Sequence, residues 1–220
     1  MEDLMRSALV DLINERRGGH LPEWTEDVIV VSEETVEKVF DIVDTKNNPG
    51  GIVRQANSGQ ATYYNGDEAH TYRLKFVKYE EYIDQFKKPA MVAGGKDNDW
   101  CKGASRPDYL CYSVDDSEHF IIHELSEGSI RSKLSDARNQ LTRCVQFLMK
   151  SPKIKQYLQH FKKRICYLSV PDGVRMEYSP NGMADSFSEI YKNIPDPNPI
   201  KCRTFERNGF EAYETKVVRL

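Results

Sequence analysis

The chain has 220 residues, of which 39% are hydrophobic and 30% charged, a composition typical of a globular protein with a buried core. Its 31 Lys and Arg against 34 Asp and Glu give a net charge of −3, which excludes an overall basic character but not a locally basic groove. It has no signal-peptide pattern and no run near the roughly 18 apolar residues of a membrane span, so we predict a single cytoplasmic domain over 1–220 without a membrane partner.

The first half of the chain alternates short regular segments with loops. Apolar spacing and composition predict a helix over 2–16, a strand over 28–31, a helix over 32–43, a loop over 44–60 and a strand over 71–77. Ser32 would cap the second helix, and Gly18-Gly19 would end the first. Asn65-Gly66 favours a type I′ turn, which predicts a hairpin between residues 63–64 and the strand over 71–77.

The second half carries the strongest periodic signals. After a loop over 89–106 we predict strands over 109–114 and 118–126, a helix over 130–150, a helix after Pro152, a strand over 164–170, a short helix near 183–191 and a last strand within 211–220. The helix over 130–150 has a clear apolar stripe that includes Leu134, Leu141 and Leu148. The five cysteines form no C-x-x-C pair, which favours reduced cysteines over a zinc site. Together these elements predict an α/β fold.

Two carboxylates flank the predicted hairpin of the second half. If the turn is centred on Asp116, residues whose numbers sum to 232 lie opposite each other, and Asp108 lies opposite Glu124. Opposite side chains share one face about 4.5–5.5 Å apart, and like charges there repel unless a cation lies between them. Carboxylate oxygens suit Mg²⁺ or Mn²⁺. Strand alternation puts Ser126 on the face of Glu124 and His123 on the other.

Pro107-Asp108, a strand, a turn, an apolar strand ending in Glu124-Leu125-Ser126 and a long helix resemble the PD-(D/E)xK nuclease superfamily. The resemblance covers about residues 105–170 and implies a restriction-endonuclease-like fold, with a mixed central sheet flanked by helices. The helix over 2–16 would pack on it as the first core helix. The resemblance further implies that Asp108, Glu124 and the Leu125 carbonyl bind Mg²⁺ or Mn²⁺.

The sequence departs from this family at one position. Ser126 stands where the family has a lysine that positions or activates the attacking water. Candidate replacements on the following helix are Lys133 and Arg131, and the same helix carries Arg138, Gln140 and Arg143, which could hold phosphates or orient water. A plainer interpretation makes Asp108 a turn residue and pairs Glu124 with Arg131 or Arg138.

Three functions follow from these alternatives. The first is a metal-dependent phosphodiester hydrolase acting on DNA, such as an endonuclease of a restriction or defence system, with Asp108, Glu124, Ser126, Lys133 and Gln140 at its active site. The second is a nuclease-like fold that has lost catalysis and binds nucleic acid or protein. The third is an α/β protein with an unrelated small-molecule site. A second copy of the chain is a further candidate partner.

Overall fold

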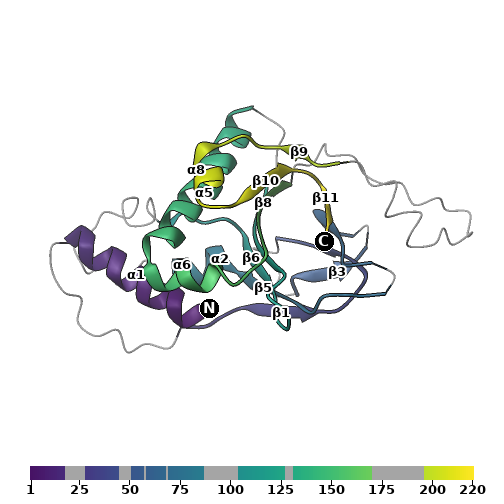
Figure 1. Cartoon of the computed structure of the whole chain (residues 1–220), viewed down its shortest axis with the longest axis horizontal. Helices are drawn as coiled ribbons and strands as arrows, with labels where there is room; N and C mark the ends of the chain where they lie inside the picture. The colour runs from purple at the N-terminus through teal and green to yellow at the C-terminus, as the bar shows by residue number, and fades with distance from the viewer. Residues whose placement is uncertain are drawn as a thin grey trace, which may run out of the picture.

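The computed structural model describes residues 1–17, 28–44, 51–56, 58–67, 69–86, 104–126, 131–169 and 196–220, without the side chains of 13–17 and 131–133. The predicted short helix near 183–191 and most of the predicted loop over 89–106 lie outside these residues. Within the described residues, helices cover one side of a large sheet and a smaller sheet covers the other, which gives three layers (Figure 1).

The large sheet is mixed. Its strands are, in spatial order, β1 (Ser32–Thr35), β5 (Leu74–Lys78), β6 (Tyr109–Ser113), β7 (His119–Leu125), β8 (Lys163–Ser169), β10 (Glu211–Glu214) and β9 (Asn198–Pro199). The neighbours from β1 to β7 pair antiparallel, β7, β8 and β10 pair in parallel, and β9 pairs antiparallel with β10. A parallel pair needs a crossover connection, which helices supply between β7 and β8.

The helices bury one face of this sheet. They are α1 (Glu2–Arg17), α2 (Tyr79–Asp84), α5 (Arg131–Lys150), α6 (Pro152–Leu158) and α8 (Arg203–Arg207). Leu9 of α1, Leu141 of α5 and Leu158 of α6 lie in one core cluster with Ile122 of β7, and all four are fully buried. The predicted large mixed sheet flanked by helices is confirmed.

The smaller sheet covers the opposite face. Its strands are β11 (Val217–Arg219), β4 (Ala61–Tyr64), β2 (Val39–Ile42) and β3 (Val53–Gln55), in that spatial order. Phe40 of β2 stacks on Tyr63 of β4 at 5.2 Å between ring centroids, and both rings meet Phe76 of β5 edge-on. Aromatic burial of this kind joins the two sheets across a second core.

Three predictions for the first half are wrong, and for the helix over 32–43 the reason is that pairing between distant segments overrides local spacing. Residues 32–43 form β1 and β2 instead of a helix, since Phe40 lies opposite Tyr63 in the small sheet. The strand predicted over 28–31 begins only at Ser32, and the loop predicted over 44–60 contains β3.

The predicted hairpin at Asn65-Gly66 is also wrong. Gly66 has a positive φ of 81°, so a turn is present, but β4 and β5 belong to different sheets. The Asn65 side chain donates to the Tyr72 carbonyl at 2.8 Å and accepts from its N–H at 3.2 Å, which closes a corner between the sheets. The last predicted strand likewise divides into β10 and β11, one in each sheet.

None of the described helices is both long enough and apolar enough to cross a bilayer.

Candidate active site

The β6–β7 hairpin has the register predicted from the sequence. Tyr109 lies opposite His123 and Leu110 lies opposite Ile122, so paired residues sum to 232. The ladder ends one residue short of Asp108 and Glu124, and the same register continued by one step puts these two opposite each other. Leu110 and Ile122, one strand repeat away, both face the helices. Positions 108 and 124 therefore lie on the helix-covered face.

Asp108 is held at the end of this ladder by two contacts. Its Oδ2 accepts a hydrogen bond from the Leu125 N–H at 2.6 Å, and its carbonyl accepts one from the Tyr79 N–H at 2.9 Å. The first contact places the Asp108 carboxylate beside the backbone of the residue that follows Glu124. Asp108 thus has a structural role as well, because it satisfies a backbone donor where the ladder ends.

Pro107 removes a ladder bond next to this contact. In the continued register Pro107 lies opposite Leu125, and the Leu125 N–H points toward β6, where it meets Asp108. The Leu125 carbonyl points to the same side, but proline has no N–H to donate to it. The ladder therefore leaves an oxygen acceptor next to the carboxylate of Asp108, which suits a hard cation.

Glu124 is buried, with 8% of its surface exposed, and its carboxylate faces α5. With its amide nitrogen directed toward Glu124, Gln140 donates to Oε1 at 2.7 Å and to Oε2 at 3.0 Å. The opposite orientation would put the amide oxygen against the carboxylate. One neutral amide nitrogen thus contacts both oxygens of the carboxylate, and it adds no charge of its own. The predicted Gln140 thus lies at Glu124.

The arginines of α5 do not share this position as far as their side chains are described. Arg138 forms an ion pair with Glu214 of β10 at 2.8 Å, so its alternative pairing with Glu124 is wrong. Arg143 is exposed on the outer side of the helix. Arg131 and Lys133 belong to the first turn of α5, and their side chains lie outside the described residues.

Two buried groups that sequence reasoning missed line this region. Cys144 lies one helical turn after Gln140 in α5. Tyr79 lies next to Asp108, whose carbonyl accepts a hydrogen bond from the Tyr79 N–H. Burial raises the pKa of the Cys144 thiol, and the negative charge of Glu124 acts in the same direction. Burial also raises the pKa of Tyr79 well above its ordinary value. Both groups therefore stay protonated, so they line the candidate site and do not act as nucleophiles. The i, i+4 spacing from Gln140 would have indicated that Cys144 lies near the same site.

Ser126 continues the line of β7 beyond Glu124. Its N–H donates to the Ser169 carbonyl at 2.8 Å, which fixes its backbone to β8. Its side chain is partly exposed. The strand alternation therefore keeps Ser126 at the solvent-accessible end of the strand, next to Glu124 in sequence.

His123 faces away from this site, as predicted. Its Nδ1 lies 2.5 Å from the Tyr63 hydroxyl and its Nε2 lies 2.8 Å from Ser169 Oγ. Ser169 Oγ donates to the Thr215 carbonyl at 2.7 Å, so its oxygen accepts from Nε2–H, and Nδ1 accepts from Tyr63. Burial lowers the pKa of His123 to about 3. A neutral imidazole thus links the two sheets.

Within the described residues, no three Asp, Glu, His or Cys side chains gather closely enough to hold a metal ion. A cation site here would therefore consist of two carboxylates and the Leu125 carbonyl. Comparison with protein-family models, with curated proteins and with solved structures found no match.

Proposed function

We propose that this protein is a divalent-metal-dependent phosphodiester hydrolase with a restriction-endonuclease-like fold, and that its substrate is DNA. The observation that supports the proposal is the register of the β6–β7 hairpin, which, continued by one step beyond Tyr109 and His123, would put Asp108 opposite Glu124. The hairpin, α5 and the returning parallel strand β8 follow in the order that the resemblance implies. The buried free cysteines Cys111, Cys144 and Cys166 support the reducing cytoplasm as its location.

Asp108, Glu124 and the Leu125 carbonyl would hold Mg²⁺ or Mn²⁺. When bound, such an ion supplies a Lewis acid for the scissile phosphate and lowers the pKa of a water molecule. The chain's own contribution is orientation. Gln140 fixes both oxygens of the Glu124 carboxylate, and Pro107 leaves the Leu125 carbonyl without a ladder donor. These contacts preorganise the oxygens at one end of the hairpin.

Lys133 would supply the positive charge that Ser126 lacks. Position 133 lies seven residues before Gln140 in α5, and residues seven apart share one helix face. A lysine on the face that carries Gln140 belongs to the same side of the helix as Glu124. Its charge would stabilise the developing charge on the phosphate rather than attack it.

Lys133→Met is expected to lower cleavage of supercoiled DNA by about 10- to 1,000-fold, because one charged group that stabilises the transition state is lost. Stabilisation by Mn²⁺ should remain, because no proposed metal ligand changes. Lys155→Met, at an exposed position of α6 outside the candidate site, is the matched control. Equal cleavage by the wild type and Lys133→Met would remove Lys133 from the mechanism.

A second function is favoured by Ser126. A hydroxyl carries no positive charge, so the fold could bind nucleic acid without cutting it. This alternative keeps the nucleic-acid partner and removes turnover.

Mn²⁺ is expected to raise the melting temperature of the wild type and not that of Glu124→Gln. At about ten times its dissociation constant the ion adds about 1.4 kcal/mol to the unfolding free energy. For a chain of this size that is a rise of about 3 to 6 °C. Differential scanning fluorimetry at constant ionic strength measures it.

Glu34→Gln provides the matched control, because it removes the same charge from β1, where Arg73 keeps its ion pair with Asp115 at 3.2 Å. This variant should retain the Mn²⁺ shift. A shift that persists in Glu124→Gln, or its absence from the wild type, counts against the metal site.

A further inference from the structure

The charge of this chain is strongly segregated along its sequence. Residues 131–169 contain ten Lys and Arg and one acidic residue, Asp136. The other 181 residues contain 21 Lys and Arg and 33 Asp and Glu. The net charge of −3 therefore hides a segment of +9, which forms α5, α6 and β8.

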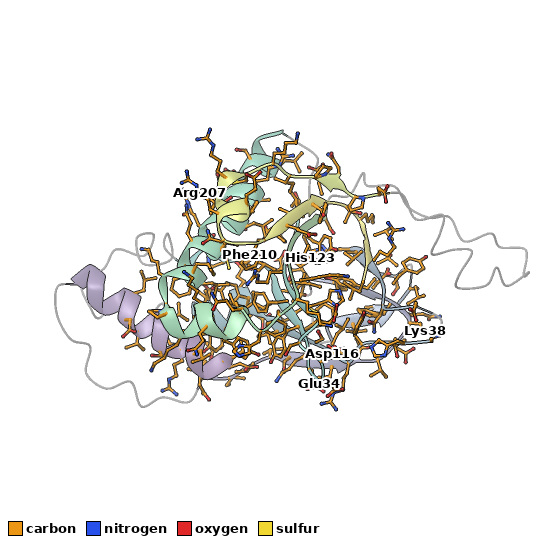
Figure 2. All side chains as sticks on the ribbon, viewed as in Figure 1. Glu34, Lys38, Asp116, His123, Arg207 and Phe210 are labelled. Carbon is orange, nitrogen blue, oxygen red and sulfur yellow. The ribbon has the colours of Figure 1, made fainter. Side chains whose placement is uncertain are left out.

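The structure adds three exposed cations from a distant part of the chain to this segment, namely Lys201, Arg203 and Arg207. Thr142 Oγ1 of α5 lies 4.0 Å from Cys202 Sγ, directly before α8. Arg143 follows Thr142 and Arg203 follows Cys202, so these two arginines flank the contact between the helices. Arg207 lies one turn after Arg203 on the same face of α8, and Figure 2 shows it on the outward side, while Phe210 points inward.

Five exposed side chains define what we name the α5–α8 basic surface: Arg143, Lys150, Lys201, Arg203 and Arg207. Within the residues that the structure describes, none of the five reaches a carboxylate. Many cations elsewhere are paired with carboxylates, for example Lys75 with Glu2 at 3.2 Å and Arg219 with Asp196 at 2.9 Å. Uncompensated cations on one face are typical of a surface for a polyanion.

We propose that the α5–α8 basic surface binds the phosphate backbone of nucleic acid. The choice of nucleic acid as the polyanion rests on the proposed function. Three of the five cations are arginines, whose planar groups suit phosphate oxygens. A lipid surface is a poorer partner, because membrane-binding faces combine basic and apolar groups. The exposed large apolar side chains of the described residues are Ile29, Val31 and Val36, which flank β1 and do not belong to this surface.

The surface and the candidate active site share one rigid element. Gln140, which bonds Glu124, and Arg143 are three residues apart in α5 and are neighbours on its surface. A 20-residue helix is about 30 Å long, comparable to roughly nine base-pair steps of a duplex. Backbone bound along α5 and α8 would therefore lie beside the site.

The triple variant Arg143→Gln, Arg203→Gln, Arg207→Gln is expected to bind nucleic acid at least about tenfold more weakly than the wild type. The slope of log affinity against log salt should fall by about three, because each phosphate contact contributes about one. Fluorescence anisotropy measures both with a labelled duplex of about 20 base pairs and the matching single strand, in EDTA, between about 50 and 200 mM salt.

The matched control is Arg73→Gln, Lys75→Gln, Arg219→Gln, which removes three ion-paired cations and changes the net charge equally. This control should keep affinity and slope within about twofold of the wild type. Equal losses in both triple variants, or tighter binding to anionic lipid vesicles than to either nucleic acid, would overturn the proposal, as would absence of binding by the wild type.

Because the measurement is made without metal, its failure is distinct from failure of the hydrolase proposal. Binding without a Mn²⁺ shift or cleavage retains the basic surface and rejects the enzyme. If the wild type cleaves DNA and the Arg143, Arg203, Arg207 triple variant binds nucleic acid as tightly as the wild type, the hydrolase proposal is retained and the basic surface is rejected.

Discussion

Replacing Glu124 by Gln is expected to lower the nicking of supercoiled DNA in Mn²⁺ by at least about 100-fold, while the protein stays folded. Loss of a carboxylate ligand removes charge that holds the cation and stabilises the phosphate in the transition state. The variant has nearly the same shape, and its amide oxygen can still accept from Gln140, whose nitrogen lies 2.7 Å from Oε1. The fold and the reaction are thus affected separately.

The measurement is the initial rate of conversion of supercoiled plasmid to nicked plasmid, with circular dichroism and melting temperature as checks on folding. Glu34→Gln on β1 is the control, because Glu34 lies 3.7 Å from Arg73 and outside the candidate site. It should nick at the wild-type rate. A Glu124→Gln protein that nicks as fast as the wild type would falsify the role of Glu124. If the wild type binds Mn²⁺ but does not nick DNA, the result supports the second function, a nuclease-like fold without catalysis.

Asp108→Asn is a weaker test of the same site, for a reason that the structure makes visible. The Asp108 carboxylate accepts a hydrogen bond from the Leu125 N–H at 2.6 Å. A loss of activity in Asp108→Asn could therefore follow from a loosened strand end instead of a lost metal ligand. Asparagine keeps one oxygen for that bond, but its orientation is not fixed by charge. Glu124 is therefore the residue on which the hydrolase proposal is best tested.

The sequence contained enough information to place the β6–β7 hairpin. The polar turn at 115–117 and the apolar runs on either side fix a register in which a shift by one residue would exchange the two faces of the strand. Both faces are buried here, one against the helices and one against the small sheet, so only one register satisfies the pattern. The same reasoning places His123 and Ser126 on opposite faces of the strand, and His123 does face away from the candidate site.

The small sheet could not be predicted in the same way. β2 pairs with β4, about 20 residues on, and β4 pairs with β11, more than 150 residues on. Local spacing of Val36, Val39, Phe40 and Val43 fits a helix, yet Val36 is 57% exposed and Phe40 is buried against Tyr63. Pairing of this kind depends on partners that a local window does not contain.

The candidate site shows the same division. The sequence indicates Gln140 as a candidate because it lies on the polar face of the helix that follows Glu124 and because the resemblance favours a glutamine in this helix. The pairing of Arg138 with Glu214 depends on β10, which returns from a distant part of the chain, so no local pattern indicates it. Tyr79 reaches Asp108 only because β5 pairs with β6.

Acid is expected to unfold this protein, with two buried histidines as the main cause. Burial lowers the pKa of His123 to about 3 and that of His119 to about 4. In the unfolded chain both titrate near 6.5, so as the pH falls below that value the unfolded state takes up protons that the folded state does not. Stability is fully present above about pH 6.5 and is lost as the pH falls toward 4 and 3.

The size of the loss follows from the proton difference. Each imidazole contributes about 1.4 kcal/mol per pH unit, or about 3 kcal/mol by pH 4. Two of them remove about 6 to 7 kcal/mol, which is comparable to the whole stability of many domains. Urea unfolding at a series of pH values, followed by circular dichroism, should show a slope approaching two protons between about pH 6 and 4.

His119→Phe separates the two histidines. The His119 ring packs edge-on against Tyr72 at 4.7 Å, and neither of its buried nitrogens has a hydrogen-bond partner among the described residues. Phenylalanine keeps the ring contact and removes two unsatisfied polar atoms, so stability at neutral pH should be retained or increased. Its acid slope should fall by about one proton. Equal acid slopes in the wild type and His119→Phe would mean that burial of this imidazole does not destabilise the protein in acid.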